Sequence, residues 1–485
     1  MLQVLIVGVL YLLLYKYLLS TLGIELLGVW SLIIATTSVA LIANFGISSS
    51  IVKFVATYHA RGELHTLKKL VFTASLFIVG TYLIISISLW LLSPYFMPYF
   101  IEKKYLATAL SILPYSLFCL VINALGGVIS SSLDGIQKNY LKSYIVSSTS
   151  VLLFVLSVAL TPAYGLKGLV FAQIIQGFCA LFLSGYFLSL NVHGIFSLKW
   201  NWSNNLFKEI INYGLKMQAL SIMQMTFEPV TKGLLSKFGG LAMVGYYEMA
   251  SRLVSQFRSI IVSANQVIIP VIAAANENNK NEIKTIYVKT FSLIFFFNCI
   301  TTSIIIVFAP LISLLWIGKI VPFFLFAIVV NSIVVFVNIM SNPAYFSYLG
   351  EGRLNKLIYS YLIIVVLNGG LGYILGSNFN QYGVVLAWNV SFLLSSLFIL
   401  LIYQKQNAVA WHEIVKLNNF YLLVASLFFG IFGYLFCLDI VDKTFNIIHL
   451  TLFIISSLVY LNFIYKNEYS ALLRTEFLKI IKIQK

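Results

Sequence analysis

The sequence predicts an all-α polytopic membrane protein, because it has few charges, long apolar runs and no soluble segment of domain size. Of the 485 residues, 60% are hydrophobic and only 9% are charged, whereas a soluble chain usually carries about 25% charged residues. The apolar residues come in runs of about 20, the length of an α-helix that crosses a bilayer. A soluble protein of this length would need several charged domain surfaces, and this chain has too few charges to cover one.

Fourteen apolar segments follow one another, and each is expected to form one transmembrane helix. Their approximate bounds are 2–22, 28–50, 70–92, 106–130, 143–161, 168–190, 210–235, 242–272, 286–315, 321–346, 357–375, 383–403, 418–438 and 447–465. The first segment runs into the second without a small-residue cleavage site, so it is interpreted as a span and not as a signal peptide. The longest connection, 191–209, is too short for a soluble domain.

Lys and Arg residues in the connections predict which side of the membrane each connection faces. With both termini in the cytoplasm, the inside segments hold nineteen basic residues and the outside segments hold five. Because cytoplasmic loops carry the excess of Lys and Arg, this split predicts cytoplasmic termini and an even number of spans.

The chain also contains an internal repeat at a shift of about 216 residues. The matching segments pair 19–23 with 235–239, 28–30 with 245–247, 134–135 with 349–350, and 168–172 with 383–387. Each half holds an even number of spans, so both halves have the same orientation, as in transporters built from parallel repeats.

The repeat defines the predicted domains. An N-lobe of six spans covers 1–190, a cytoplasmic linker covers 191–209, and a C-lobe of six spans covers 210–404. Two further spans lie in 405–465. The basic tail, 466–485, is expected to be an amphipathic helix on the inner leaflet, with a frayed, solvated end as the alternative.

Ionisable residues inside the spans are the main functional signal, because a charge in hydrocarbon is costly unless it faces water or a partner. Lys53, Lys216 and Lys237 lie near span ends, where a long side chain can reach the interface. Lys16 is at an intermediate depth. The charges that lie at least one or two helical turns inside are Glu228, Lys232, Glu248, Arg252 and Arg258.

Mostly polar side chains share a helix face with these deep charges at steps of three or four residues. They are Gln218, Ser221, Met225, Glu228 and Lys232 in 210–235, and Glu248, Arg252, Ser255, Ser259 and Gln266 in 242–272. Thr37, Asn44 and Ser48 form a weaker stripe in 28–50. We expect these faces to line a water-filled cavity between the two halves.

Two interpretations of the deep charges stay open. Glu228 with Lys232, and Glu248 with Arg252, have the four-residue spacing of a helical ion pair, so internal pairing is one interpretation. The spans and their ends, however, hold seven basic and two acidic residues, an excess of +5 that suits an anionic cargo. Arg binds phosphate through a planar fork, and Lys acts as a point charge. The candidate anion-binding residues are Lys16, Lys232, Arg252 and Arg258, and the candidate cavity-lining residues are Asn44, Ser48, Gln218, Ser221, Ser255 and Ser259.

Other kinds of chemistry are not indicated. The four cysteines lie singly in apolar runs, so neither a metal site nor a disulfide framework is expected. There is no P-loop, no H-E-x-x-H motif and no long outside loop for a glycosyltransferase or polymerase site. We therefore expect a protein that is not an enzyme and holds no cofactor. The net charge of +16 does not indicate nucleic acid, because no basic module stands apart from the apolar runs.

Several short motifs carry a family resemblance. In the first half they are Leu22-Gly23, Gly28-Val29-Trp30-Ser31-Leu32, Asn44-Phe45-Gly46-Ile47 and Ala60-Arg61-Gly62-Glu63. In the second half they are Val244-Gly245-Tyr246-Tyr247, Ala250-Ser251-Arg252-Leu253 and Pro270. By their order and spacing, nearly the whole chain resembles the bacterial polysaccharide (O-antigen) flippases of the multidrug/oligosaccharidyl-lipid/polysaccharide exporter (MOP) superfamily. The family usually has Asp-Leu-Gly where this chain has Asn44-Phe45-Gly46, so an ion-coupling role is not carried over to that position.

The resemblance implies a fourteen-span exporter of the bacterial cytoplasmic (inner) membrane, with two six-span lobes around a central cationic cavity. Such proteins flip an undecaprenyl-pyrophosphate-linked oligosaccharide, a repeat unit of O-antigen (lipopolysaccharide), capsule or exopolysaccharide, by alternating access. Membrane lipid, a polysaccharide polymerase and a chain-length regulator are the implied candidate partners. Glu228 and Glu248, the only deep acids, are candidates for coupling to a proton or sodium gradient.

Aromatic residues and rival functions complete the expectations. Tyr11, Tyr15, Tyr246 and Tyr247 are candidates to stack on sugar rings.

A drug/cation antiporter of the same superfamily is one alternative function, but it would need acidic groups to hold a cationic cargo. The related lipid II flippase of peptidoglycan synthesis is a second alternative, and a membrane polymerase or ligase of glycans is a third.

Overall fold

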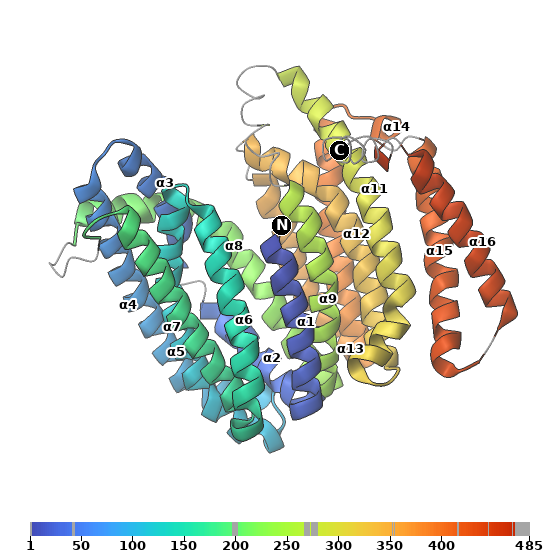
Figure 1. Ribbon diagram of the computed structural model, residues 1–485, viewed down its shortest axis with the longest axis horizontal. Coiled ribbons are helices and arrows are strands. Elements are labelled where there is room, and N and C mark those ends of the chain that lie inside the picture. The colour runs from blue at the N-terminus through green and yellow to red at the C-terminus, as the bar shows by residue number, and fades with distance from the viewer. Residues whose placement is uncertain are drawn as a thin grey trace, which may run out of the picture. The chain divides into compact units, whose positions relative to one another are not determined.

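The computed structural model describes residues 2–40, 44–195, 202–265, 272, 280–351, 353, 355–414, 417–444, 446–467 and 469–470, and all regular structure in these residues is helical (Figure 1). The first half of the chain forms α1 (Leu2–Leu22), α2 (Ile24–Val39), α3 (Ile47–Ala60), α4 (Leu64–Phe96), η2 (Met97–Tyr99), α5 (Lys103–Gly135), α6 (Asn139–Tyr164) and α7 (Leu166–Asn191). The second half forms α8 (Asn204–Gly239), α9 (Leu241–Asn265), α11 (Lys280–Ile312), η3 (Ser313–Ile317), α12 (Pro322–Gly350), α13 (Asn355–Gln406), α14 (Trp411–Ile414), α15 (Leu417–Asp442) and α16 (Ile447–Lys466). The predicted tail helix lies almost wholly outside the described residues.

Packing divides the chain into two compact units. The N unit comprises 2–248 and 368–384, and the C unit comprises 249–367 and 385–485. Both α9 and α13 therefore contribute to both units. This division by packing differs from the division by repeat, because α8 packs within the N unit although the repeat assigns it to the C-lobe. The predicted lobe boundaries stay a prediction.

In the N unit, α5 packs against α4 and α7, and α6 packs against α1 and α7. Its core contains aliphatic side chains with no exposed surface, among them Ile51, Leu67, Leu70 and Leu133. Both α2 and α3 contact α8. The helix that carries Glu228 and Lys232 is thus held inside this unit.

In the C unit, α11 packs against α12 and α15, and α16 packs against α15 (Figure 1). A hydrogen bond of 3.0 Å between Ser303 on α11 and Tyr460 on α16 adds a buried polar contact. The two C-terminal helices are therefore an integral part of the C unit.

Apart from 28–50, the described parts of the predicted spans fall on helices. Among the described residues, ten helices are long and apolar enough to cross a membrane, and one of them, α13, holds two predicted spans that meet at a kink at Phe379 and Asn380. Neither α8 nor α9 is among the ten, because polar and charged residues lower their hydropathy. The chain is an all-α, multi-pass membrane protein.

The structure corrects the second predicted span, 28–50, which is not one helix. Phe45 and Gly46 have positive φ angles of 46° and 68° between the end of α2 and the start of α3, and left-handed residues cannot continue a right-handed helix. A Cβ on Gly46 would lie 2.2 Å from the carbonyl oxygen of Gly214 on α8, so glycine is needed where α8 approaches the break. Asn44 therefore lies in this break and not on a helix face.

Three pairs of turns reproduce the internal repeat in their backbone geometry. Gly165 (φ 58°, ψ −138°) between α6 and α7 has the conformation of Asn380 (φ 51°, ψ −138°) in the α13 kink, at a shift of 215 residues. Gly23 (φ 81°, ψ 169°) matches Gly240 (φ 80°, ψ 172°), so the sequence alignment, which paired Gly23 with Gly239, was wrong by one position.

The third pair of turns follows α5 and α12. The backbone N–H of Lys138 donates to the carbonyl of Leu133, and that of Arg353 donates to the carbonyl of Tyr348, each at 2.9 Å. Because unusual backbone conformations recur at the repeat distance, the two halves of the chain have the same backbone geometry at these turns.

Side chains are distributed as in a protein surrounded by lipid. Large apolar residues on the spans are exposed, such as Ile84 at 68% and Leu458 at 64%, whereas Ser132 and Asn298 are fully buried. Small and polar residues at helix–helix contacts and apolar residues outside are typical of membrane helices.

Candidate functional site

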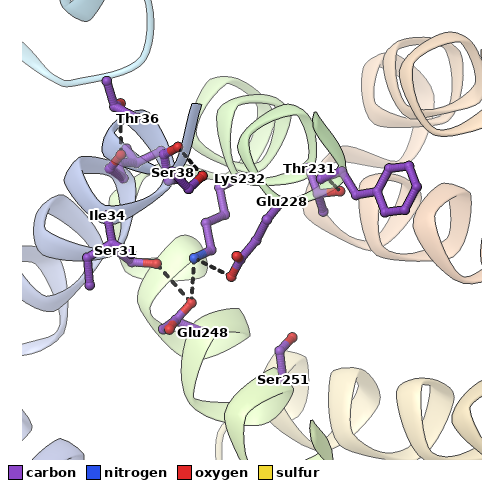
Figure 2. Close-up of polar contacts among 12 residues, drawn as sticks. Ser31, Ile34, Thr36, Ser38, Glu228, Thr231, Lys232, Glu248 and Ser251 are labelled. Carbon is purple, nitrogen blue, oxygen red and sulfur yellow. Dashed lines mark hydrogen bonds and ion pairs between the residues drawn. The ribbon is translucent and has the colours of Figure 1, made fainter. Parts of the chain in front are cut away.

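Three of the predicted charges meet in one buried cluster of the N unit. Lys232 on α8 lies between two carboxylates, with its Nζ 2.8 Å from Glu228 Oε1 and 2.7 Å from Glu248 Oε2 (Figure 2). The Lys232 and Glu248 side chains are each 1% exposed, whereas that of Glu228 is 50% exposed. The cluster therefore has a dry ion pair at its centre and one acid at its edge.

Two side chains of the first half complete this cluster. The Tyr15 hydroxyl on α1 donates to Glu248 Oε1 at 2.6 Å, and the Ser31 hydroxyl on α2 donates to Glu248 Oε2 at 3.0 Å. With Lys232, three donors surround the two oxygens of Glu248, which is an arrangement that suits a carboxylate. Both Tyr15 and Ser31 are fully buried, and the Tyr15 ring packs 5.6 Å from the Trp30 ring.

Hydrogen bonds between α8 and α13 anchor the part of α8 that carries Lys232. Thr231 and Asn368 exchange hydrogen bonds of 3.0 to 3.3 Å, and the Asn368 amide also donates to the carbonyl of Phe227. Pro229, which leaves the carbonyl of Met225 without its usual helical partner, lies within this stretch of α8. The helix is thus anchored on one side while it presents Lys232 on another.

The cluster contains the pairing of Glu228 with Lys232 that was one of the two interpretations. Their internal pairing, expected as the alternative to anion binding, is present, and Lys232 has a second acidic partner as well. A buried ammonium between two carboxylates is not available to a phosphate in this conformation. Lys232 is therefore a structural cation here, and its assignment as an anion-binding residue stays a prediction about another state.

The remaining basic candidates lie elsewhere. Lys16 is exposed on α1, and Arg252 is partly buried on α9. Arg258 on α9 belongs to the C unit, where its Nε–H donates to Asn338 Oδ1 on α12 at 2.8 Å. In the part of the chain that the structure describes, no ion pair forms between Arg258 and an acidic side chain.

Two tyrosines lie in the neighbourhood of Arg258. Tyr345 on α12 and Tyr361 on α13 lie close enough to interact electrostatically with the guanidinium. Their hydroxyls are hydrogen-bonded to each other at 3.2 Å. A neutral acceptor such as Asn338 leaves the positive charge of the guanidinium uncompensated, which is what an anion site requires.

The candidate lining residues have different positions. Asn44 and Ser48 hydrogen-bond to each other across the start of α3, with the Asn44 amide 3.3 Å from the Ser48 hydroxyl. Ser255 and Ser259 on α9 donate to backbone carbonyls three residues earlier, so their hydroxyls are used within the helix. The backbones of Gln218 and Ser221 lie in α8, but their side chains are outside the described residues.

The structure corrects the role expected for three tyrosines. Tyr15, Tyr246 and Tyr247 are at most 7% exposed, so they pack in the interior and present no face to a sugar ring in this conformation. Tyr15 serves the cluster through its hydroxyl instead.

Sequence reasoning missed Tyr15 and Ser31 as members of the cluster, although the repeat could have found them. At a shift of 217 residues, Tyr15 corresponds to Lys232 and Ser31 to Glu248. The same two repeat positions of each half therefore meet in one cluster. The first half contributes neutral polar side chains, and the second half contributes charged ones. Asn338 was also missed, although Asn331, seven residues earlier on α12, gives a helical spacing that could have indicated it.

Two further features limit the chemistry available. An apolar pocket of about 510 Å³ between α2, α4 and α8 is lined by side chains such as Leu32, Phe96, Pro229 and Val230 and suits hydrocarbon rather than phosphate. Within the described residues, no group of three or more His, Cys, Asp or Glu side chains could hold a metal ion.

Comparison with known proteins shows a family match and a similarity to solved transporter structures. A model of the polysaccharide biosynthesis protein family matches residues 22–319, and no curated protein matches the sequence. A multidrug resistance MATE family transporter of the MOP superfamily, inward-facing, is 16% identical, with a TM-score of 0.71 over 83% of this chain and 94% of that chain. The lipid II flippase MurJ, inward closed, is 14% identical, with a TM-score of 0.70 over 96% of this chain and 97% of that chain. A MOP superfamily transporter from Pyrococcus furiosus is 15% identical, with a TM-score of 0.60 over 84% and 94%.

The chain shares the fold of the MATE transporter and of the lipid II flippase, which agrees with the fold that the sequence motifs implied. The match to the lipid II flippase covers more of this chain than the match to the MATE transporter does, 96% against 83%. Because the family model covers more than half of the chain, the chain belongs to the polysaccharide biosynthesis protein family.

Proposed function

We propose that this protein is a flippase that moves undecaprenyl-pyrophosphate-linked oligosaccharide across the bacterial cytoplasmic membrane, with both termini inside, and that it catalyses no covalent chemistry. The observation that carries the proposal is Arg258, a membrane-embedded guanidinium whose described partners are all neutral. An unneutralised guanidinium in a span is costly unless it meets an anion during function. In a chain of the polysaccharide biosynthesis family, a lipid-linked sugar pyrophosphate is an anion that fits.

Among the candidate residues, the proposal assigns the anion to Arg258 first. Arg258 is the principal phosphate ligand, because its planar fork can bind two phosphate oxygens at once. Arg252, six residues or about 1.7 turns away on the same helix, is the second candidate. Lys16 stays a candidate through its exposed side chain on α1, whereas Lys232 is occupied by its two carboxylates.

Two alternatives differ in cargo. A drug/cation antiporter would need an uncompensated acid, but both deep acids share Lys232. The similarity over 96% of the chain to the lipid II flippase favours that function as a second candidate, since its cargo is also lipid-linked. The Pyrococcus furiosus relative is described by a reversed polarity of its binding pocket and a different function, which supports pocket charge as the property that separates cargoes within this fold.

Deletion of the gene tests the function directly. We expect lipid-linked glycan to accumulate in the inner leaflet and the cognate surface polysaccharide to be lost, while growth continues. Loss of viability with accumulation of lipid II would assign the second candidate, and altered drug resistance without glycan accumulation would assign the antiporter. An unchanged amount of surface polysaccharide, with altered chain length only, would indicate a polymerase or ligase.

Complementation of the deletion tests the cationic site. Arg252→Ala combined with Arg258→Ala is expected to abolish restoration of the surface polysaccharide, because the phosphate loses both guanidinium ligands. Lys208→Ala, which removes an exposed charge at the start of α8, is the matched control and should complement fully. Full complementation by the double arginine variant at equal protein level would contradict the mechanism.

For coupling to a proton gradient, we assign Glu228 before Glu248. Glu228 is half exposed and has Lys232 as its partner, whereas Glu248 is buried beneath three donors. In vesicles, Glu228→Gln is expected to remove the dependence of glycan transport on an imposed pH gradient. Transport by the wild-type protein that ignores both pH and sodium gradients would show that neither acid couples to an ion.

A further inference from the structure

Two layers of polar side chains lie along the same three helices of the C unit. The first layer consists of Ser251 on α9, Asn331 on α12 and Asn389 on α13, and the second consists of Arg258, Asn338 and Ser396 on the same helices in the same order. On every helix the second layer follows the first by seven residues, which is two turns, or about 10.5 Å of axial rise. The layers are therefore built alike, and only the second contains a charge.

In the first layer, hydrogen bonds are donated from α13 towards α9. The Asn389 amide donates to Asn331 Oδ1 at 2.8 Å, and the Asn331 amide donates to the Ser251 hydroxyl at 3.4 Å. Asn331 and Asn389 are 5% and 3% exposed. This layer is closed and neutral, as expected for a contact that fastens membrane helices together.

In the second layer, the direction of donation is reversed. Arg258 donates through Nε to Asn338 Oδ1 at 2.8 Å, and the Asn338 amide donates to the Ser396 hydroxyl at 3.0 Å. Ser396 in turn donates to the carbonyl of Phe392 at 2.8 Å, so its oxygen must accept from Asn338. This chain of donors and acceptors fixes the amide of Asn338 with its oxygen towards Arg258.

The consequence for the guanidinium is geometric. The Nε–H of Arg258 donates to the amide oxygen of Asn338, and the amide nitrogen of Asn338 is anchored by Ser396. Arg258 and Asn338 are both only partly buried. Within the described chain, the hydrogen bond to Asn338 uses one of the five donors of Arg258. Among the described residues, no carboxylate pairs with the two terminal nitrogens, which form the fork that binds phosphate bidentately.

We infer that Asn338 is a positioning residue for Arg258 and that it orients the guanidinium fork towards a pyrophosphate group of the cargo. The inference rests on the proposed function and adds to it, because it predicts that an uncharged residue on another helix controls anion affinity. A neutral acceptor is essential in this role, since an amide oxygen orients the guanidinium without cancelling its charge.

Binding of inorganic pyrophosphate to the full-length protein in lipid nanodiscs, measured by calorimetry, tests the inference. Asn338→Asp keeps the size and the acceptor but adds a carboxylate that neutralises Arg258. The dissociation constant is expected to rise by about ten- to a hundredfold, while the thermal midpoint stays equal or rises. Wild-type affinity in this variant would contradict the need for a neutral acceptor beside Arg258.

The first layer supplies the matched control. Asn331→Leu removes the equivalent asparagine about two turns away, and since distant sites act independently, the dissociation constant should stay within about twofold of the wild-type value. Asn338→Leu, which removes the orienting acceptor without adding charge, should also weaken binding, so the test does not depend on the aspartate variant folding.

The outcomes separate the inference from the proposed function. Wild-type affinity in both Asn338 variants, with binding lost in Arg258→Ala, would overturn the positioning role and leave the anion site intact. Absence of pyrophosphate binding by the wild-type protein would overturn the anion site itself and the inference with it.

Discussion

At the scale of single residues, the burial of one charge decides how this protein uses its lysine. Lys232 lies in a span, where an unpaired ammonium is costly, and it is compensated by a fully buried Glu248 and a half-exposed Glu228. Tyr15 and Ser31 hold Glu248 in place, so the ion pair is set in a shell of donors. Arg258 contrasts with it, because its partners are neutral and its charge stays available.

Removal of the lysine is expected to destabilise the protein strongly. In Lys232→Met the carboxylate of Glu248 stays buried without its cation, and breaking a buried ion pair in this way typically lowers the free energy of unfolding by about 3–5 kcal/mol. Chemical unfolding in detergent, followed by tryptophan fluorescence, measures the change.

A second substitution should relieve this loss. Lys232→Met combined with Glu248→Gln is expected to be more stable than Lys232→Met alone, because no uncompensated charge is left in the interior. Glu228→Gln should have a smaller effect, since water already solvates half of that side chain. Additive effects of the two substitutions in the double variant would contradict a direct ion pair.

At the scale of helices, glycines at repeat-related positions set how closely two helices approach. Gly28 on α2 and Gly245 on α9 correspond at a shift of 217 residues, and their helices cross in contact within the N unit. A Cβ on Gly28 would lie 2.1 Å from the carbonyl oxygen of Leu241, and one on Gly245 would lie 2.7 Å from that of Ile24. This crossing brings the start of α9, and with it Glu248, next to Ser31 on α2.

Alanine at the crossing is expected to force the helices apart. Gly28→Ala should lower the free energy of unfolding by about 1–3 kcal/mol, the range found for overpacking a well-packed contact. Gly126→Ala on α5 is the control, because a Cβ there meets no atom within 4 Å, and alanine in a helix should stabilise by about 0.5–1 kcal/mol. Thermal unfolding in detergent compares the two, and equal effects would contradict the close crossing.

The kink in α13 gives a second prediction for an element. Asn380 has the conformation of its repeat partner Gly165 but carries a side chain, which is strained at φ 51° and ψ −138°. Asn380→Gly should therefore raise the free energy of unfolding by about 1 kcal/mol. Asn378→Gly, two residues earlier in helical conformation, should instead lower it, and a loss of stability in both variants would show that the kink is not strained.

At the scale of the whole molecule, charge placement predicts the orientation in the membrane. Basic residues concentrate in the connections on one side, where α14 lies, and the turn between α15 and α16 belongs to the other side. Of the native cysteines, Cys119, Cys299 and Cys437 are buried and Cys179 is partly buried, so all four can be replaced by alanine to give a background without thiols.

Labelling of introduced cysteines tests the orientation. A membrane-impermeant maleimide is expected to label Lys443→Cys, in the exposed turn after α15, on intact cells. His412→Cys, exposed on α14, should react only after permeabilisation. The reverse pattern would place both termini outside and contradict the distribution of Lys and Arg.

Much of this could be predicted from the sequence, because hydropathy and charge act locally. Runs of about 20 apolar residues specify spans whatever they pack against, so the helices, the repeat and the family motifs could all be recognised before any contact was known. The break between α2 and α3 could not, because its cause is the approach of Gly214 on α8 to Gly46, a contact between distant residues.

The sequence by itself determined the membrane class, the order of the helices, the two-fold repeat and the short list of charges in the spans. Only the tertiary structure decided which of those charges are compensated, since an ion pair depends on the distance between atoms of different helices. It joined Lys232 to Glu248 beneath Tyr15 and Ser31, and it set Arg258 among neutral partners. Spacing along one helix can show that charges share a face, but only packing brings them within a few ångströms of a partner or keeps them apart.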